Sequence, residues 1–160
     1  MHQREPRIIS AQAFGRLPPA PSRLEQVMSY GITTTVALPF DETVTAIRAA
    51  LATQGFGVLT EIDMAATLKA KLDVDMPSQV ILGACNPPLA LRALQAEESI
   101  GLLLPCNVTV RDAGDGTSLV EALDPKVMVD VTGNEALRAV ADEAADRLGA
   151  ALAEVGSGNE

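Results

Sequence analysis

The sequence contains few side chains that could carry out chemistry. Its 160 residues include one histidine, one tyrosine, two cysteines and no tryptophan. The single histidine, His2, stands near the N-terminus, where we expect it to be solvated, so a Ser-His-Asp triad is excluded. Two cysteines are too few for a disulfide scaffold and supply only half of a tetrahedral zinc site. We therefore expect no metal site, and the sequence leaves open the cofactor and whether the protein is an enzyme.

Other familiar signatures are missing as well. There is no Walker or dinucleotide-binding fingerprint, and no run of about 18 apolar residues that could span a membrane. Lysine and arginine number 12 against 21 acidic residues, a formal net charge of -9 that argues against a nucleic-acid partner. No apolar segment follows the N-terminal charges as it would in a secretory signal. We expect a cytoplasmic protein with reduced thiols.

Composition divides the chain into three parts. Residues 1–27 hold four prolines and four arginines without clear periodicity, so we expect a flexible arm there. Residues 28–156 carry regularly spaced apolar side chains. Since 48% of the sequence is hydrophobic, this part can build a single packed core. Residues 157–160 are predicted to fray.

The spacing of apolar residues predicts an α+β fold. The stretches 32–40 and 56–62 alternate with a period of two, and further apolar runs at 80–84, 102–110 and 117–123 complete five predicted strands. Helices are predicted between the first four strands and at the C-terminal end. A hairpin signal at 112–116 favours a mainly antiparallel or mixed sheet with helices packed on one face. A doubly wound parallel sheet is the alternative, and it fits less well because no glycine-rich phosphate loop follows a strand.

Polar residues mark where the helices should begin. Asp41, Asp63 and Asn86 are predicted N-caps, and Thr132 with Glu135 fits a capping box before the last helix. That helix carries an apolar stripe formed by Leu137, Val140, Ala141, Ala144, Leu148, Ala151, Leu152 and Val155. The segment 127–131 is ambiguous.

The two cysteines are the best candidates for a functional site, because each is followed by asparagine and lies beside proline. Two prolines follow Cys85 and Asn86, and Pro105 precedes Cys106 and Asn107. If Asn86 caps a helix, Cys85 lies near the positive end of the helix dipole, which favours its thiolate. Pro105 predicts a sheet edge or a bulge that would turn Cys106 toward a pocket. Packing in the core is the alternative role for both cysteines.

Glu61 and Lys71 are predicted to lie at the rim of the same site. In one pocket they could form an acid–base pair, which would make the protein an enzyme, and we rank this hypothesis last. Lys71 is also explained by its place in the last turn of a predicted helix, where a cation suits the dipole.

Two stretches, Ile81–Pro87 and Ile100–Val108, each contain a Cys-Asn pair, and together they resemble the core of the family called domain of unknown function 302, DUF302. The segments 60–63 and 68–72 and the pair Asp124-Pro125 are also similar to the pattern of this family. The resemblance extends over residues 30–155. It implies a small α+β domain with a site around the two Cys-Asn pairs, and it implies no activity or cofactor.

These features favour a small-ligand-binding or thiol-redox module whose site is formed by Cys85, Asn86, Cys106 and Asn107. Asparagine amides can orient a polar ligand, and thiols can be oxidised. The alternative is a structural or interaction protein with the cysteines in its core. In that case the last helix, or a sheet edge near Pro105, would pack against a second copy in a homodimer. The ligand and the oligomeric state stay open.

Overall fold

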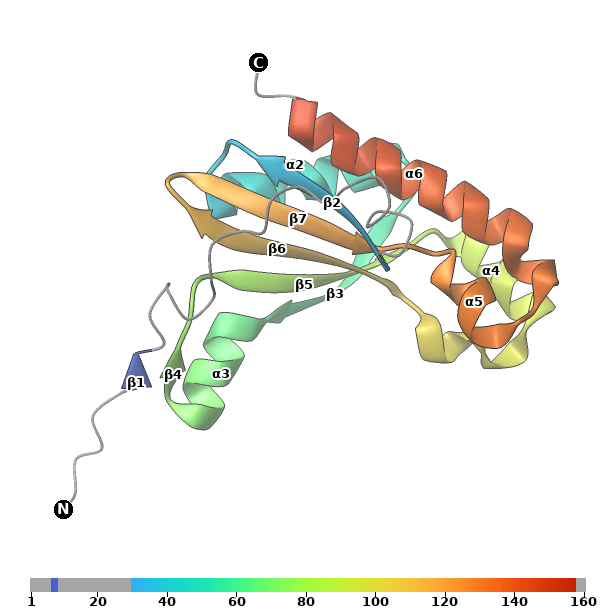
Figure 1. The fold of residues 1–160 in the computed structure, drawn as a ribbon, viewed down its shortest axis with the longest axis horizontal. Helices are drawn as coiled ribbons and strands as arrows, with labels where there is room; N and C mark the ends of the chain where they lie inside the picture. Colours follow the sequence, from blue (N-terminus) through green and yellow to red (C-terminus); the bar gives the residue numbers. More distant parts are fainter. Residues whose placement is uncertain (1–6, 9–29, 158–160) are drawn as a thin grey trace.

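The computed structural model describes residues 7–8 and 30–157. The rest of the expected arm at residues 1–27, and residues 158–160 of the expected tail, lie outside the described residues. The described chain forms one antiparallel sheet of five strands, and two long helices, α2 (Phe40–Thr53) and α6 (Arg138–Ser157), pack on one of its faces (Figure 1). The predicted α+β class, with a mainly antiparallel sheet and helices on one face, is confirmed.

The order of the strands places the chain's two Cys-Asn segments side by side. Across the sheet the strands are β2 (Gly31–Val36), β7 (Thr117–Leu123), β6 (Cys106–Gly114), β5 (Gln79–Cys85) and β3 (Gly57–Asp63). Each neighbouring pair is antiparallel. The edges of the sheet are therefore β2 and β3, while β5 and β6 lie inside it.

Pro105 does not mark a sheet edge or a bulge, and this prediction was wrong. β6 lies between β5 and β7, and its register with β5 is regular at Cys106. Pro105 precedes the first residue of the strand, where its missing N–H leaves the ladder intact, and its peptide bond with Leu104 is cis. The strand predicted at 102–110 instead begins at Cys106 and extends to Gly114, because residues 98–103 form a 3-10 helix, η2 (Glu98–Leu103).

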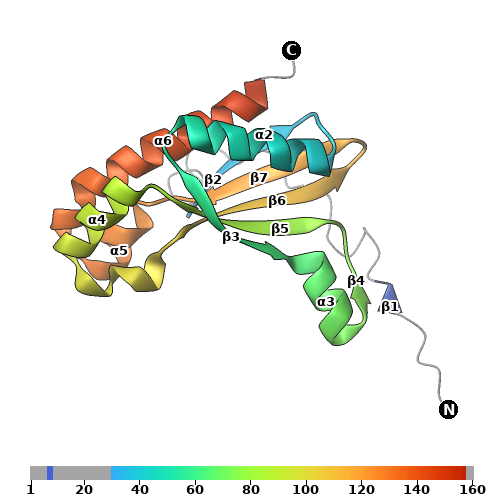
Figure 2. The same cartoon turned by 180° about the vertical axis from the view of Figure 1, so that it is seen from behind.

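The core consists of two hydrophobic clusters. The larger one lies between the sheet and helices α2 and α6. The smaller one lies beyond the end of the sheet, among α4 (Pro87–Ala96), η2, α5 (Val127–Thr132), η3 (Glu135–Leu137) and α6 (Figure 2). The whole predicted stripe of the last helix is buried across both clusters. Since this stripe packs inside the chain, it is not free to form an interface with a second copy.

Two of the predicted helix caps are confirmed. The Asp63 carboxylate accepts a hydrogen bond from the Ala66 N–H at 2.8 Å, at the start of α3 (Met64–Leu72). The Asn86 side chain accepts one from the Leu89 N–H at 3.3 Å, at the start of α4. Each cap satisfies a backbone donor that has no partner within the helix.

Two other cap predictions were wrong. Helix α2 begins at Phe40 without a side-chain cap, so Asp41 falls within the first turn, where its charge suits the helix dipole. The capping box is absent because Thr132 ends α5, where its hydroxyl donates to the Met128 carbonyl at 2.6 Å. Asn134 caps η3 in its place, accepting from the Ala136 N–H at 3.0 Å.

The hairpin predicted at 112–116 is confirmed between β6 and β7. Asp115 and Gly116 have φ angles of 54° and 70°, both in the left-handed region. A two-residue turn of this kind matches the twist of the flanking strands.

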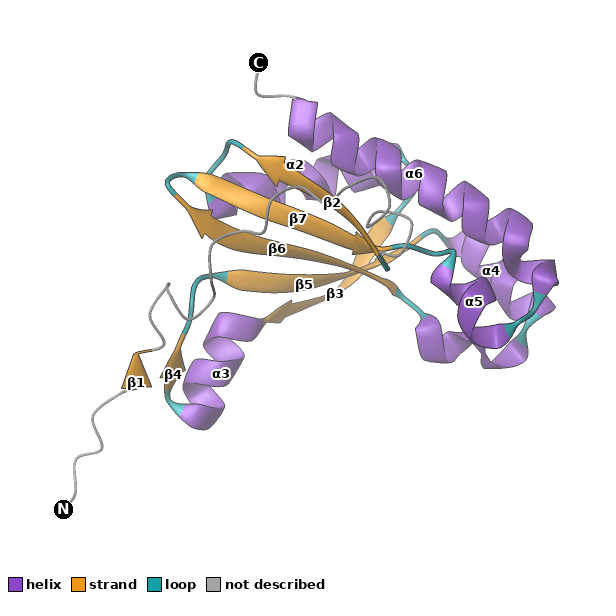
Figure 3. Ribbon diagram, in the orientation of Figure 1, coloured by secondary structure: helices purple, strands orange, loops and turns teal. Residues whose placement is uncertain are grey.

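A second, very small sheet lies beyond α3 and apart from the main one (Figure 3). In it, β1 (Arg7–Ile8) runs parallel to β4 (Val74–Asp75). Two-residue strands carry no periodicity, so the sequence did not predict them. Among the helices that the structure describes, none is long and apolar enough to cross a membrane.

Candidate functional site

A half-enclosed pocket opens where β5 ends and β6 begins, and both cysteines line it. Helices α4 and α6 and the short helix α5 form its other walls, mainly through Leu89, Ala93, Met128, Val140 and Ala144. Its lining is almost entirely apolar. The cavity volume of about 30 Å³ leaves room for roughly two water molecules.

The pairing of β5 with β6 brings the cysteines together. Ala84 pairs with Cys106, so both lie on the helix-covered face, and Cys106 is 8% exposed. Cys85 is the next residue of β5, which places the two cysteine α-carbons about 6 Å apart by strand spacing. In a regular strand Cys85 would point to the opposite face. However, β5 ends at Cys85 and the chain turns into α4, so this half-buried residue still borders the pocket.

The pocket keeps the Cys106 thiol protonated. Burial, with a smaller contribution from charge repulsion between the Cys85 and Cys106 thiolates, raises the pKa of Cys106 to about 11. At neutral pH Cys106 is therefore a neutral thiol and a poor nucleophile.

Asn86 holds the turn between Cys85 and helix α4. Its side chain is buried, and its oxygen caps the helix. Its amide nitrogen faces the backbone at Gly55, where an added β-carbon would lie 3.0 Å from Asn86 Nδ2. Gly55 has a φ of 83°, a conformation that side chains rarely adopt. The Asn86 side chain therefore holds the start of α4, at the pocket entrance, through its hydrogen bond with the backbone N–H of Leu89.

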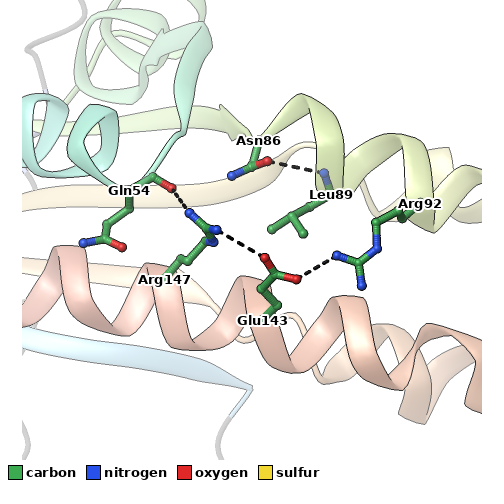
Figure 4. Close-up of polar contacts among 6 residues, drawn as sticks. All are labelled: Gln54, Asn86, Leu89, Arg92, Glu143 and Arg147. Atoms are coloured by element: carbon green, nitrogen blue, oxygen red, sulfur yellow. Dashed lines mark hydrogen bonds and ion pairs between the residues drawn. The ribbon is translucent and has the colours of Figure 1, made fainter.

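Three charged residues join the two helices that wall the pocket (Figure 4). Arg92 of α4 donates to Glu143 of α6 at 2.7 Å, and Arg147 donates to the other Glu143 oxygen at 3.2 Å. Arg147 also donates to the Gln54 carbonyl at 3.2 Å, at the end of α2. Hydrogen bonds from Arg92 and Arg147 lower the pKa of Glu143, so it stays ionised. We call Arg92, Glu143 and Arg147 the helix clamp.

The structure brings together three of the six residues predicted for the site. Cys85, Asn86 and Cys106 line the pocket, whereas Asn107, Glu61 and Lys71 do not. Asn107 is exposed on β6, and alternation along the strand turns it away from the face of Cys106.

The two charged residues lie elsewhere on the surface. Glu61 forms an ion pair with Arg48 of α2. Lys71 is exposed on α3, and no ion pair joins it to Glu61 in the part of the chain that the structure describes. Over the same residues, no group of three or more histidine, cysteine, aspartate or glutamate side chains could hold a metal ion.

Sequence reasoning missed two contributors to this site. Met128 lines the pocket from α5, in a segment whose structure was ambiguous. The helix clamp joins Arg92 to a residue 51 positions away, and no pattern in the sequence indicates such a contact.

Comparisons with known proteins agree on the family. The model of a family described as "Domain of unknown function DUF302" matches residues 32–155. Among solved structures, the chain is similar to the crystal structure of an uncharacterized conserved protein DUF302 from Bacillus stearothermophilus. The two are 30% identical with a TM-score of 0.73, over 79% of this chain and 98% of that chain. No curated protein matches the chain.

Proposed function

The chain belongs to the DUF302 family, and we propose that it is a small-ligand-binding module whose ligand sits between the thiols of Cys85 and Cys106. The observation that carries this proposal is that the only two cysteines of the chain, 21 positions apart in sequence, line one pocket. Packing alone does not require both thiols to border the same cavity. A ligand that contacts both thiols does require them to border the same cavity.

The lining of the pocket defines which ligands fit. A nearly apolar surface without charged side chains penalises a polar or charged group that enters it unpaired. The small volume limits the size of the group that enters, and the apolar lining favours an apolar or polarisable one. Because the pocket is half-enclosed, the rest of a larger ligand would extend outside. The Asn86 oxygen is already used as a helix cap, so it does not orient the ligand as the sequence suggested.

Ligand binding is better supported than thiol redox chemistry. The raised pKa of Cys106 leaves little thiolate at neutral pH, and thiolates are the species that attack disulfides.

Xenon is a suitable probe of the pocket, because dry apolar cavities bind it. In NMR spectra of the full chain under xenon pressure, we expect shifts of the methyl signals of Leu89 and Val140. An Ala93→Leu variant, which fills the cavity, should lose these shifts and keep its circular dichroism spectrum. If the methyl signals of the wild-type protein do not shift under xenon, the pocket is not a binding site and the proposal is wrong.

A homodimeric interaction protein is the second candidate, and the edge strand β3 favours it. Leu59 and Ile62 on this strand are 67% and 46% exposed, and an edge strand offers unpaired backbone groups to a partner. Light scattering tests this candidate: a dimer that Ile62→Lys converts to a monomer would support it, and a wild-type monomer would exclude it.

A further inference from the structure

We propose that the ligand of the pocket is monovalent copper, Cu(I), held by the sulfur atoms of Cys85, Cys106 and Met128. This inference rests on the proposed function, because it concerns the same pocket, and it names the ligand.

Three sulfur-containing side chains line the pocket. Both cysteines and one of the five methionines line it, and they arrive from three separate elements, β5, β6 and α5. Cys106 and Met128 are 8% and 4% exposed, and Cys85 is half-buried at the end of its strand. Ala84 of β5 pairs with Cys106 of β6, so Cys85 is the neighbour of the residue directly opposite Cys106.

The donor set selects the metal. Thiolate and thioether sulfurs are soft ligands that prefer Cu(I), whereas carboxylate, carbonyl and water oxygens suit magnesium and calcium. The described pocket lining contains no carboxylate or imidazole. Structural zinc requires four ligands, while these residues offer three sulfurs in a water-poor pocket. A soft ion that sheds its water readily therefore fits, and a hard, hydrated ion does not.

Charge and volume also agree with this ion. Cu(I) replaces the proton of a thiol, the proton leaves to solvent, and the copper stays monovalent, so no oxidant or reductant takes part. One thiolate balances the single positive charge, and the resulting neutral complex suits a pocket without charged side chains. A cavity of about 30 Å³ has room for a single ion between its sulfur ligands.

An anaerobic competition titration of the full chain against the Cu(I) chelator bicinchoninate tests the proposal. We expect the wild-type protein to take one Cu(I) per chain from the chelator. Cys85→Ser and Cys106→Ser should weaken binding by about 100-fold or more, and Met128→Leu by about tenfold, since losing only an outer partner of a metal ligand already costs about 10–100-fold. Met64→Leu on α3 should bind like the wild type, which controls for a methionine outside the pocket lining.

Circular dichroism checks that each variant is folded, and Met128→Leu conserves volume, so it should preserve the core. Failure of the wild-type chain to remove Cu(I) from the chelator overturns the proposal, as does wild-type affinity in all three sulfur variants. Full affinity in Met128→Leu alone would contradict the role of the thioether. If xenon still shifts the pocket methyl signals while Cu(I) does not bind, copper is excluded and the ligand-binding pocket stands.

Discussion

Ala84 of β5 and Cys106 of β6 are paired directly across the antiparallel ladder. This one pairing sets the position of the candidate site. It places Cys106 on the helix-covered face and Cys85, the next residue along β5, at the end of the adjacent strand. Asn86 then turns the chain into α4, whose inner face closes the pocket. The sheet register thus brings together thiols that are remote in the sequence.

The two asparagines of the Cys-Asn pairs should respond differently to the same substitution. Asn86→Ala removes the cap of α4, and loss of such a cap costs about 1 kcal/mol. Asn107→Ala changes an exposed side chain and should stay within about 0.5 kcal/mol of the wild type. Denaturant unfolding of both variants measures the difference. Equal losses of stability would contradict the role of Asn86 as a cap.

Gly83 should not tolerate even a methyl group. A β-carbon at Gly83 would overlap Oγ1 of Thr60 on β3 and lie 2.9 Å from Cγ of Pro105. We expect Gly83→Ala to destabilise the fold by about 1–3 kcal/mol through overpacking. Gly57→Ala, in open space on β3, is the matched control and should be neutral or slightly stabilising. A lower melting temperature for Gly57→Ala than for Gly83→Ala would contradict this packing around Gly83.

Stability should fall in alkaline solution partly because of Cys106. Burial raises the pKa of this thiol from 9.0 to about 11 in the folded protein. Between these pH values the unfolded chain loses the proton and the folded chain keeps it, so the free energy of unfolding falls as pH rises. The stabilisation is complete below pH 9.0 and is lost as the pH approaches about 11.

Comparison with Cys106→Ala isolates this effect from other alkaline groups. From pH 9 to pH 11, the wild type should lose about 2 kcal/mol more stability than the variant. Urea unfolding at several pH values gives the slope of the free energy of unfolding against pH for the wild type and for the variant. Parallel slopes would show that the Cys106 thiol is not held in its neutral form.

The helix clamp should control access to the pocket. Glu143→Gln removes the carboxylate that joins Arg92 of α4 to α6, so the two pocket walls can separate. The residues of this ion pair are partly exposed, so the fold should persist. We expect iodoacetamide to alkylate Cys106 faster in Glu143→Gln than in the wild type, measured by mass spectrometry of the folded protein.

Glu135→Gln is the control for the clamp. It breaks the ion pair of Glu135 with Arg138, three positions along the chain, which connects η3 to the start of α6 and does not connect α4 to α6. Its alkylation rate should equal that of the wild type. An unchanged rate in Glu143→Gln would mean that the clamp does not limit access to the pocket.

Local signals made much of the fold predictable from the sequence. Asp63 and Asn86 cap helices because their side chains bond to backbone N–H groups three residues ahead, and that relationship is visible in the sequence. Asp115 and Gly116 tolerate left-handed backbone, so the hairpin was also predictable. The hairpin made one antiparallel pair predictable and favoured a mainly antiparallel or mixed sheet, but it did not give the order of the other strands.

The remaining features of the fold and of the candidate site depend on contacts between residues that are distant in the sequence. The sequence at Pro105 predicts an edge or a bulge, because a proline before a strand and a proline at an edge look alike in sequence. Only the pairing of β6 with β5 and β7 decides between them. The prediction of Glu61 at the pocket rim is wrong because Glu61 pairs with Arg48 of α2, and no pattern in the sequence indicates that contact. The DUF302 resemblance gave the right family, which the comparisons confirm, and it could not supply the pocket geometry.

Phenylarsine oxide tests the central claim most directly, since its arsenic atom binds two thiols at once and releases one water. We predict one phenylarsenic adduct per chain by native mass spectrometry of the folded wild-type protein. Cys85→Ser and Cys106→Ser should each abolish it. An adduct that persists in either single variant, or a wild-type protein that forms none, would contradict a pocket shared by the two sulfurs.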